Sequence, residues 1–503
     1  MRPSETDPRR RASAATAARR CAPLLACISV AFVLSGAARP APGAHLSFAA
    51  ARHYATGADP QAFAIADLNG DRRPDVVTAN SDGKSVSVLR NRGNGTFAPK
   101  RDYRVGGEAW SILVAELNGD AKPDLVVRRG NSFSVLLNRG HGSFVQGQST
   151  EAGLGCEDCV ASVDLNGDRR ADVVTVSDDV VSVFVNRGDG TFVPSRDYVV
   201  AGPDVGEIVL ADLNGDGRPD IATATYRRVS VRLNKGDGSF GPLRNYKARA
   251  GSLVAADLNR DNTIDLVSTD QSEDVMDFAS VLLNRGHGTF RRARKYAVGT
   301  NAGESALADL NGDSVPELIA QYGGTAAVFI NRGNGTFRRK RDYSTPWFFH
   351  FTVANVNGGG SPDLVFSSWD LGRVGVLLNR GHGKFSRLLQ YRTLDGPTSL
   401  AVTDVNTDRL RDVLTLSNAT DGGGNRVSVL LNKPGLCDVQ DVFQKTLAVA
   451  RATLARGGCR LGRVTWGYST VKRGRVMRQR PRFGTVLHRG SEVDVVLSLG
   501  RRR

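Results

Sequence analysis

Acidic and amide side chains alternate along the stretch DLNGDRRPD, which runs from Asp67 to Asp75. Asp67, Asn69, Asp71 and Asp75 stand at its positions one, three, five and nine. A short loop with this spacing can turn several side-chain oxygens onto one hard cation, and calcium binds such oxygen ligands. The stretch therefore predicts a calcium-binding loop.

The same stretch recurs down the chain at intervals of about 45 to 52 residues, a period typical of propeller blades. Its eight copies begin at Asp67, Glu116, Asp164, Asp212, Asp257, Asp309, Asn355 and Asp404. Eight copies predict eight repeated structural units.

Each copy is embedded in a pattern of short strands. Residues 62–80, AFAIADLNGDRRPDVVTAN, place an apolar segment on either side of the loop, so the loop joins two strands of a hairpin. A third strand, such as SVSVLRN, leads into an NRGxGxF motif, whose glycines suit a tight turn before a fourth strand. The motif occupies Asn91 to Phe97, Asn138 to Phe144, Asn186 to Phe192, Asn284 to Phe290, Asn331 to Phe337 and Asn379 to Phe385, with NKGDGSF at Asn234 to Phe240.

A Tyr follows the motif's Phe by six residues in most copies, for example Phe97 and Tyr103. Six is an even number, so both rings face the same side of a strand, where we expect them to pack between adjacent sheets. The last copy ends at Asn432 without its Phe strand, whereas residues 46–57 carry Phe48 and Tyr54 with no repeat before them. We therefore expect residues 46–57 to supply the outer strand of the last sheet and to close a ring.

Residues 46–435 resemble the FG-GAP or VCBS repeats of integrin-α-like β-propellers, on their DxNxDGxxD-type loops and GxGxF turns. The resemblance implies an all-β propeller, eight-bladed from the loop count or seven-bladed as in integrin heads. It also implies calcium bound by loop positions one, three, five and nine. The expected ligands are Asp67, Asn69, Asp71, Asp75, Glu116, Asn118, Asp120, Asp124, Asp164, Asn166, Asp168, Asp172, Asp212, Asn214, Asp216, Asp220, Asp257, Asn259, Asp261, Asp265, Asp309, Asn311, Asp313, Glu317, Asp404, Asn406, Asp408 and Asp412.

Two alternatives to this metal site remain. An EF-hand would need flanking helices, Gly at loop position six and Glu at position twelve, whereas these loops have Gly mostly at position four and strand-rich flanks. The other alternative is a metal-free Asp/Asn turn. The copy with Asn355, Asn357 and Gly359 has one acid, Asp363, so we expect a weak or empty site there.

The net charge of +16 is concentrated at the two ends of the chain. Residues 437–503 carry fifteen Lys or Arg and four acids, net +11, and residues 1–37 carry net +4, which leaves +1 for residues 38–436. The repeats therefore lack the charge of a nucleic-acid-binding protein, and a polyanionic partner would belong to the C-terminal segment.

The N-terminus predicts export. Residues 1–38 combine an Arg-rich start, an apolar run and small residues, the pattern of a secretory signal peptide. A lipoprotein in which Cys27 is lipidated is an alternative. No later segment reaches the length of a membrane span, so we expect a secreted protein, either free or associated with the cell wall.

Export permits disulfides, and spacing makes two local pairs the economical connectivity. Cys437 and Cys459 bracket a predicted helix and are expected to form a structural bridge. Cys156 and Cys159 form a CxxC, which we interpret as a loop disulfide; a redox motif or half a zinc site are the alternatives.

Residues 437–500 change character: DVFQKTLAVARATLARGG has helical spacing, and three short strand-like segments follow. This small α+β unit resembles a PASTA domain on Tyr468-Ser469, Gly474, Gln479, Pro481 and Gly484-Thr485. The resemblance implies peptidoglycan binding or a spacer role. The basic residues 501–503 could hold anionic wall polymers or simply remain solvated.

Sequence motifs of catalysis are absent: there is no GxSxG, HExxH or phosphate-binding loop. We therefore expect a non-enzymatic, monomeric recognition or adhesion module whose protein or glycan ligand binds a propeller face. Residues 346–351, PWFFHF, depart from the repeat and are either ligand-binding or extra core. The alternatives are a lectin-like propeller and a polysaccharide lyase or hydrolase, which would need a non-repeated acid, Tyr or His cluster in the central channel; none is visible in the sequence.

Overall fold

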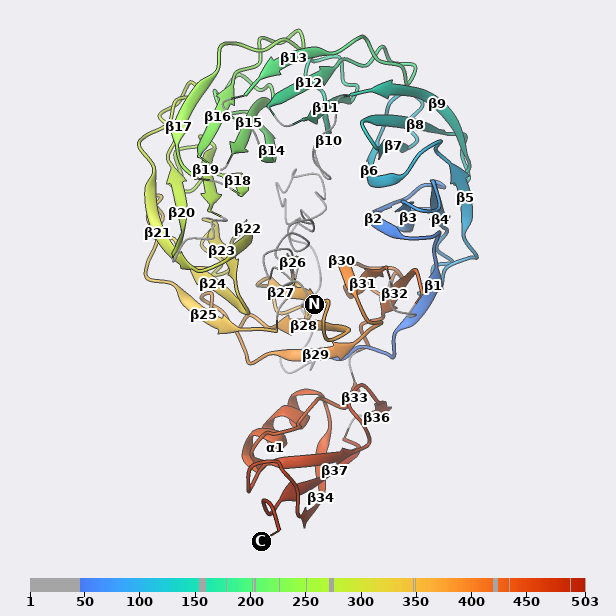
Figure 1. The fold of residues 1–503 in the computed structure, drawn as a ribbon, viewed down its shortest axis with the longest axis vertical. Helices are drawn as coiled ribbons and strands as arrows, with labels where there is room; N and C mark the ends of the chain where they lie inside the picture. Colours follow the sequence, from blue (N-terminus) through green and yellow to red (C-terminus); the bar gives the residue numbers. More distant parts are fainter. Residues whose placement is uncertain are drawn as a thin grey trace, which may run out of the picture.

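The computed structural model describes residues 46–502, apart from 153–159, 178, 201, 203–204, 226, 250, 271–275, 347, 349, 419–423, 434 and 489. The predicted signal peptide and the Cys156–Cys159 pair lie outside the described residues. The chain forms a ring of β-sheets with a smaller unit attached at one side (Figure 1).

Within the described residues the ring contains eight four-stranded antiparallel sheets, which follow one another in chain order (Figure 1). The innermost strands are β2 (Pro60–Ala66), β6 (Ala109–Ala115), β10 (Val160–Val163), β14 (Val205–Ala211), β18 (Ser252–Ala256), β22 (Ala302–Ala308), β26 (His350–Ala354) and β30 (Pro397–Thr403). The second strands are β3 (Asp75–Asn80), β7 (Asp124–Arg129), β11 (Asp172–Val176), β15 (Asp220–Thr225), β19 (Asp265–Thr269), β23 (Glu317–Tyr322), β27 (Asp363–Ser368) and β31 (Asp412–Ser417).

The third strands are β4 (Ser85–Leu89), β8 (Ser132–Asn138), β12 (Val180–Phe184), β16 (Arg228–Arg232), β20 (Asp277–Leu282), β24 (Thr325–Phe329), β28 (Arg373–Leu377) and β32 (Arg426–Leu430). The outermost strands are β1 (Arg52–Ala55), β5 (Arg101–Arg104), β9 (Phe144–Glu151), β13 (Arg196–Val199), β17 (Arg244–Lys247), β21 (Arg294–Gly299), β25 (Arg341–Ser344) and β29 (Leu389–Arg392). Each acidic loop thus joins an innermost strand to a second strand, as its apolar flanks predicted.

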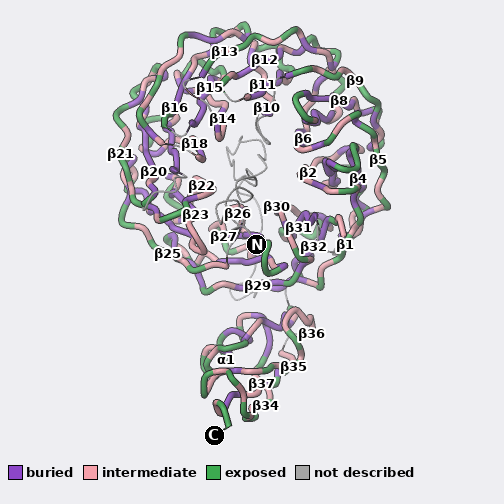
Figure 2. The backbone as a smooth tube through the Cα atoms, in the orientation of Figure 1, coloured by how far each residue is buried: buried purple, intermediate pink, exposed green. Residues whose placement is uncertain are grey.

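The core lies in the middle of the sheets, where second and third strands are covered on both faces (Figure 2). All six residues of β3, DVVTAN, are buried, and its polar side chains Asp75, Thr78 and Asn80 form hydrogen bonds there. The outermost β5 is exposed except for its half-buried Tyr103, so its sequence RDYR is mostly charged. Burial therefore decreases from the middle of each sheet to the rim.

The first described strand closes the ring, which confirms the predicted pairing. β1 lies antiparallel to β32, with Tyr54 opposite Val427 and Arg52 opposite Val429. Just before it, Phe48 forms a bridge to Asn432. The last sheet is therefore completed by residues nearly four hundred positions earlier in the chain.

The Tyr and Phe rings pack between neighbouring sheets, as expected. Tyr54 lies edge-on to Phe97 of the next repeat, with ring centroids 5.3 Å apart. The repeat that carries Thr150 lacks the Tyr, and there Phe133 from a different strand contacts Phe192 at 5.4 Å. Equivalent pairs are Tyr103–Phe144, Tyr198–Phe240, Tyr246–Phe290, Tyr296–Phe337, Tyr343–Phe385 and Tyr391–Phe48.

The C-terminal unit contains one helix, α1 (Leu447–Arg456), and a disulfide joins Cys437 to Cys459 as predicted. Its strands are β33 (Leu436–Asp438), β34 (Arg460–Gly467), β35 (Val476–Arg480), β36 (Val486–His488) and β37 (Glu492–Ser498). The expectation of three strands after the helix was wrong, since four are described there: β34, β35, β36 and β37. β34, β37 and β35 form one sheet, and the short fourth strand, β36, pairs with β33 instead.

The helix is also shorter than its sequence pattern suggested: residues 441–446 run extended or in turns, and α1 begins at Leu447. Of the described helices, none is long and apolar enough to cross a membrane.

Candidate functional site

The loop at Asp67 shows how the repeated acids are positioned. The Asp67 Oδ1 atom accepts hydrogen bonds from the backbone N–H groups of Gly70 at 2.8 Å and Asp71 at 3.1 Å, and Oδ2 accepts one from Arg72 at 2.6 Å. Gly70 and Arg72 adopt positive φ values of 81° and 64°, which turn these N–H groups toward one carboxylate. The loop is therefore a compact turn wrapped around its first acid.

Positions three and five shape the outer part of the loop. The Asn69 Oδ1 atom accepts a hydrogen bond from the Asp71 N–H at 2.9 Å, and Asp71 Oδ1 accepts one from the Arg73 N–H at 2.9 Å. These acceptors lie on an exposed tip. The corresponding first acids Asp164, Asp212, Asp257, Asp309 and Asp404 each accept backbone hydrogen bonds in the same manner.

Position nine is different because its carboxyl group is buried. Asp75 is fully buried and accepts hydrogen bonds from the N–H of Leu68 at 3.1 Å and of Asn91 at 2.7 Å. Burial raises the pKa of Asp75 to about 6; the two hydrogen bonds oppose this rise, while the charges of Asp71 and Asp67 add to it. The same two-bond arrangement holds Asp124, Asp172, Asp220, Asp265, Asp363 and Asp412.

The structure brings the predicted ligands of each loop into one turn without gathering their carboxylates into a formed metal cage. In the described chain, no group of three or more His, Cys, Asp or Glu side chains is arranged to hold a metal ion. The donor set nevertheless suits a hard cation, since carboxylate and amide oxygens are the ligands that calcium binds. A cation would also offset the repulsion from neighbouring carboxylates that adds to the burial-raised pKa of the position-nine acid.

Three loops depart from the common pattern. In the second copy the Lys122 ammonium lies 2.9 Å from Asp120, so a side-chain cation already pairs with one expected ligand. In the sixth copy the longer Glu317 accepts a hydrogen bond from the Asn311 side-chain amide at 2.7 Å. In the seventh copy Asn357 Oδ1 accepts from the Gly359 N–H at 2.6 Å, and no acid is present at its first five positions.

A second feature of this edge links neighbouring repeats. The NRGxGxF asparagine donates its side-chain N–H groups both to its own loop and to the loop of the preceding repeat: Asn138 Nδ2 lies 3.0 Å from the Pro123 carbonyl oxygen and 2.9 Å from that of Leu68. Equivalent inter-repeat bonds join Asn186 to Leu117, Asn234 to Leu165, Asn284 to Leu213, Asn331 to Leu258, Asn379 to Leu310, Asn432 to Val356 and Asn91 to Val405. The acidic loops and the glycine turns therefore form one continuous hydrogen-bonded rim.

The inner wall of the ring carries a group of side chains that the sequence motifs did not predict. Glu207 on β14, Glu304 on β22 and His350 on β26 all stand five residues before the first residue of their loops. Other described copies carry Ala or Ser there, and this break in the repeat is the signal that could have revealed the group. His350 Nδ1 lies 3.9 Å from Glu304 Oε2.

Both acids of this group bind backbone of the next innermost strand. Glu207 accepts a hydrogen bond from the Leu253 N–H at 2.5 Å, and Glu304 accepts one from the Phe351 N–H at 3.0 Å. Burial raises the pKa of Glu304 to about 8 and of Glu207 to about 7, and burial lowers the pKa of His350 to about 4. His350 is therefore neutral at pH 7.

Residues 346–351 divide between core and inner wall. Phe348 and Phe351 are buried, and Phe348 packs on Phe366 with ring centroids 4.9 Å apart. These two rings are extra core, whereas His350 faces Glu304. Trp347 and Phe349 lie outside the described residues.

The ring of four-stranded antiparallel sheets with acidic hairpin loops is the architecture of a β-propeller-like repeat protein. The model of the FG-GAP-like repeat matches residues 67–127, 164–223, 212–268, 257–320 and 309–366, which together make up more than half of the chain. The chain therefore belongs to the FG-GAP-like repeat family.

No curated protein sequence matches the chain significantly. Similar solved structures include an Agrocybe aegerita lectin described as specifically recognising non-reducing terminal N-acetylglucosamine, with 20% identity, coverage of 65% of this chain and 93% of the lectin, and a TM-score of 0.46. The V. cholerae biofilm matrix protein Bap1 has 11% identity, coverage of 77% and 91%, and a TM-score of 0.42. A functionally unknown protein from Desulfotomaculum acetoxidans has 12% identity, coverage of 63% and 98%, and a TM-score of 0.41.

Proposed function

We propose that this chain is an exported, calcium-binding, eight-bladed β-propeller that acts as a non-catalytic recognition module, with each four-stranded sheet as one blade. The observation that carries the proposal is that one edge of the sheets is repeated from blade to blade whereas the opposite edge varies. The acidic loops and glycine turns repeat along one edge, where the hydrogen-bonded rim runs. Calcium there would hold the scaffold rigid rather than catalyse a reaction.

The opposite edge supports recognition because its connections vary. Residues 81–84 join β3 to β4, whereas residues 270–276 join β19 to β20 and residues 418–425 join β31 to β32. Loops that vary on a constant scaffold are where binding specificity is usually placed. We infer that the ligand, either a protein or a glycan, binds this variable edge.

A lectin-like function is the second candidate, and an exposed aromatic side chain on the variable edge favours it. Trp369, between β27 and β28, is 39% exposed and could stack on a sugar ring. A glycan array probed with the full chain and with Trp369→Ala tests this candidate. Binding that the substitution abolishes supports a lectin; an array without hits leaves a protein ligand as the proposal.

The third candidate is an enzyme, whose catalytic side chains would be Glu207, Glu304 and His350. Two of them bind backbone N–H groups of the next strand, an arrangement that suits latching neighbouring sheets together. Incubating the chain with wall and extracellular polysaccharides should release no reducing or unsaturated ends. Release that Glu304→Gln abolishes would overturn the non-catalytic proposal.

We further propose that the C-terminal unit is a PASTA-like domain that associates with cell-wall polymer. Trp466 and Tyr468 are 54% and 57% exposed, and the Arg502 guanidinium lies 5.6 Å from the Tyr468 ring centroid. Exposed rings beside cationic side chains suit an anionic glycan polymer. The Cys437–Cys459 disulfide agrees with an oxidising location.

Sedimentation of the full chain with insoluble peptidoglycan and with teichoic-acid-bearing walls tests this association. We expect Trp466→Ala with Tyr468→Ala to reduce the bound fraction at least about tenfold, as the loss of an aromatic anchor does. Phe443→Ala is the matched control, since Phe443 is 51% exposed on the same domain. Equal loss in the control, or no binding at all, would support a spacer role instead.

A further inference from the structure

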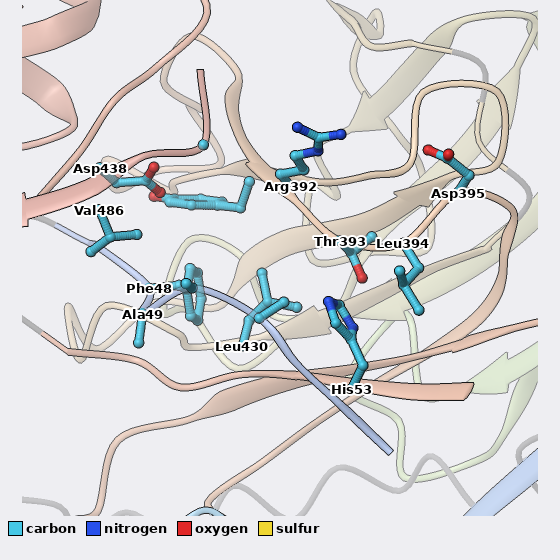
Figure 3. A pocket seen from close by; sticks show the side chains of 14 residues that line it. Phe48, Ala49, His53, Arg392, Thr393, Leu394, Asp395, Leu430, Asp438 and Val486 are labelled. Carbon is cyan, nitrogen blue, oxygen red and sulfur yellow. The ribbon is translucent and has the colours of Figure 1, made fainter. Parts of the chain in front are cut away.

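A cavity of about 340 Å³ lies where the ring meets the C-terminal domain (Figure 3). Its walls come from separate parts of the chain: residues 48–51 and His53 at the N-terminal side, residues 391–395 at the end of β29 and just after it, Leu430 on β32, and Asp438, Gly484 and Val486 of the C-terminal domain. Small-molecule sites of about 300 Å³ and more occur preferentially at such domain junctions. The cavity is distinct from the acidic loops and from the inner wall of the ring.

Direct contacts join the ring to the C-terminal domain beside the cavity. The Arg373 guanidinium lies 3.2 Å from an Asp441 carboxylate oxygen and 4.1 Å from the ring centroid of Phe483. The Gln390 N–H donates to the Gln440 side-chain oxygen at 3.0 Å. The cavity is thus a defined space between parts that contact one another.

The inner end of the cavity is apolar apart from one carboxyl group. Phe48 and Tyr391 are each 1% exposed and pack edge to face, with centroids 4.7 Å apart. The Tyr391 hydroxyl donates to the Leu46 carbonyl oxygen at 3.1 Å, so its hydrogen is already used. Asp438 is 3% exposed, and its carboxyl group points in among these side chains (Figure 3).

The Asp438 carboxyl group accepts no hydrogen bond from any described residue, and burial raises its pKa to about 8. A buried carboxyl group without a partner is costly to the fold, and native proteins seldom keep one without a use. The cavity and the unpartnered carboxyl group in its wall together indicate a ligand-binding site.

The Arg392 side chain lies on another wall of the same cavity and does not pair with Asp438. Arg392 is exposed, and in the part of the chain that is described its guanidinium forms no ion pair or hydrogen bond, with Asp438 or with any other group. His53 is engaged with Ser428 Oγ at 2.9 Å. The cavity therefore presents a buried acid, Asp438, and an exposed base, Arg392, that do not pair with each other; a second acid, Asp395, is exposed on the same wall as Arg392.

We propose that this cavity binds a small zwitterion, an α-amino acid or a short peptide, with its ammonium group on the Asp438 carboxylate and its carboxylate on the Arg392 guanidinium. A guanidinium binds a carboxylate through two parallel hydrogen bonds, which gives the pairing geometric selectivity. A neutral sugar would leave both the Arg392 guanidinium and the buried Asp438 carboxyl group without a charged partner, and a simple amine or carboxylate would leave one of them so. The inference goes beyond the proposed function, because it involves neither calcium nor the variable edge.

Isothermal titration of the full chain with glycine, diglycine and triglycine tests the proposal and measures which spacing of the two charges fits. Methylamine carries only the ammonium group, acetate carries only the carboxylate, and glucose is the neutral probe. We expect one of the three zwitterions to bind at least about tenfold more tightly than methylamine or acetate, because each of these lacks one charged hydrogen bond. Binding of glucose at equal strength, or no binding of any zwitterion, overturns the proposal.

Substitutions identify the two partners. Asp438→Asn keeps the shape of a side chain that is buried, and Arg392→Gln changes an exposed one, so both variants should fold; each should weaken zwitterion binding at least about tenfold. Arg104→Gln is the matched control, because Arg104 follows Tyr103 on β5 as Arg392 follows Tyr391 on β29. Unchanged binding in Arg392→Gln, or equal weakening in Arg104→Gln, contradicts the assignment.

Discussion

The side-chain amide of Asn91 donates a hydrogen bond to the carbonyl oxygen of Val405 at 2.9 Å, although 314 residues separate the two in the chain. This contact closes the series of asparagine bonds in which each repeat binds the loop before it. The first and last repeats are therefore joined in the same way as any other neighbours. The ring is held both by strand pairing and by this rim.

Asn91→Ala should destabilise the ring. The substitution removes the donors to Val405 and Pro74 and the acceptor of the Gly93 N–H, and it leaves buried carbonyl groups unpaired. We expect a loss of about 1–3 kcal/mol in the free energy of unfolding, measured by urea denaturation. Asn94→Ala is the control, since Asn94 lies exposed in the same turn and, among the described residues, its side chain bonds only to Thr96. Equal losses in both variants would remove the rim from the account.

Deleting residues 46–57 should open the ring. β32 would lose its partner β1 and present an unpaired edge, while Phe97 would lose its contact with Tyr54. We expect a lower melting temperature and concentration-dependent association by light scattering, relative to a chain that begins at residue 46. A monomer that melts at the unchanged temperature would show that β1 is dispensable.

The buried Asp438 predicts how stability depends on pH. Its pKa is raised to about 8 in the folded chain by burial, so between about pH 4 and pH 8 the folded state holds a proton that the unfolded state has lost. The folded state is therefore favoured at low pH and loses this contribution as pH rises. Tyr391 and Arg392 share its cavity. The stability of the parent chain should fall relative to Asp438→Asn between pH 5 and pH 8, and parallel curves from thermal melts would contradict this.

Replacing Cys437 and Cys459 together by Ala should affect the C-terminal domain alone. The bridge closes a segment of 22 residues, and loss of such a cross-link costs about 3 kcal/mol. We expect the domain to unfold at lower denaturant concentration while the ring transition stays in place. Calorimetry resolves the two transitions, and a coincident shift of both would mean that the ring depends on the domain.

The architecture was readable from the sequence because it is repeated. The loop spacing located the hairpins, and the Phe48–Tyr54 spacing located the strand that pairs with β32. The pairing of Cys437 with Cys459 followed from the helix between them. Repetition averages out local ambiguity, so each copy supported the interpretation of the others.

Two kinds of feature could not be predicted from the sequence: side chains that depart from the repeat in single copies, and contacts between segments that are distant in the chain. Glu207, Glu304 and His350 are single departures at one repeat position, and only the ring places them on a common wall. Arg392 and Asp438 line the same cavity because two domains pack together, which no local pattern encodes. The helical spacing before Leu447 was overridden by tertiary contacts, such as the Gln444 N–H bond to the Val476 carbonyl oxygen.

Calcium binding by the acidic loops is the central claim, and calorimetric titration of the full chain with Ca²⁺, with melting curves before and after chelation, tests it most directly. Chelation should lower the melting temperature and Ca²⁺ should restore it, since a site saturated about a hundredfold above its Kd adds about 2.7 kcal/mol. Asp71→Ala should reduce the bound calcium, whereas Asn357→Ala, in the acid-poor seventh loop, should not. A chain that takes up no Ca²⁺ and melts identically with and without chelator would contradict the account.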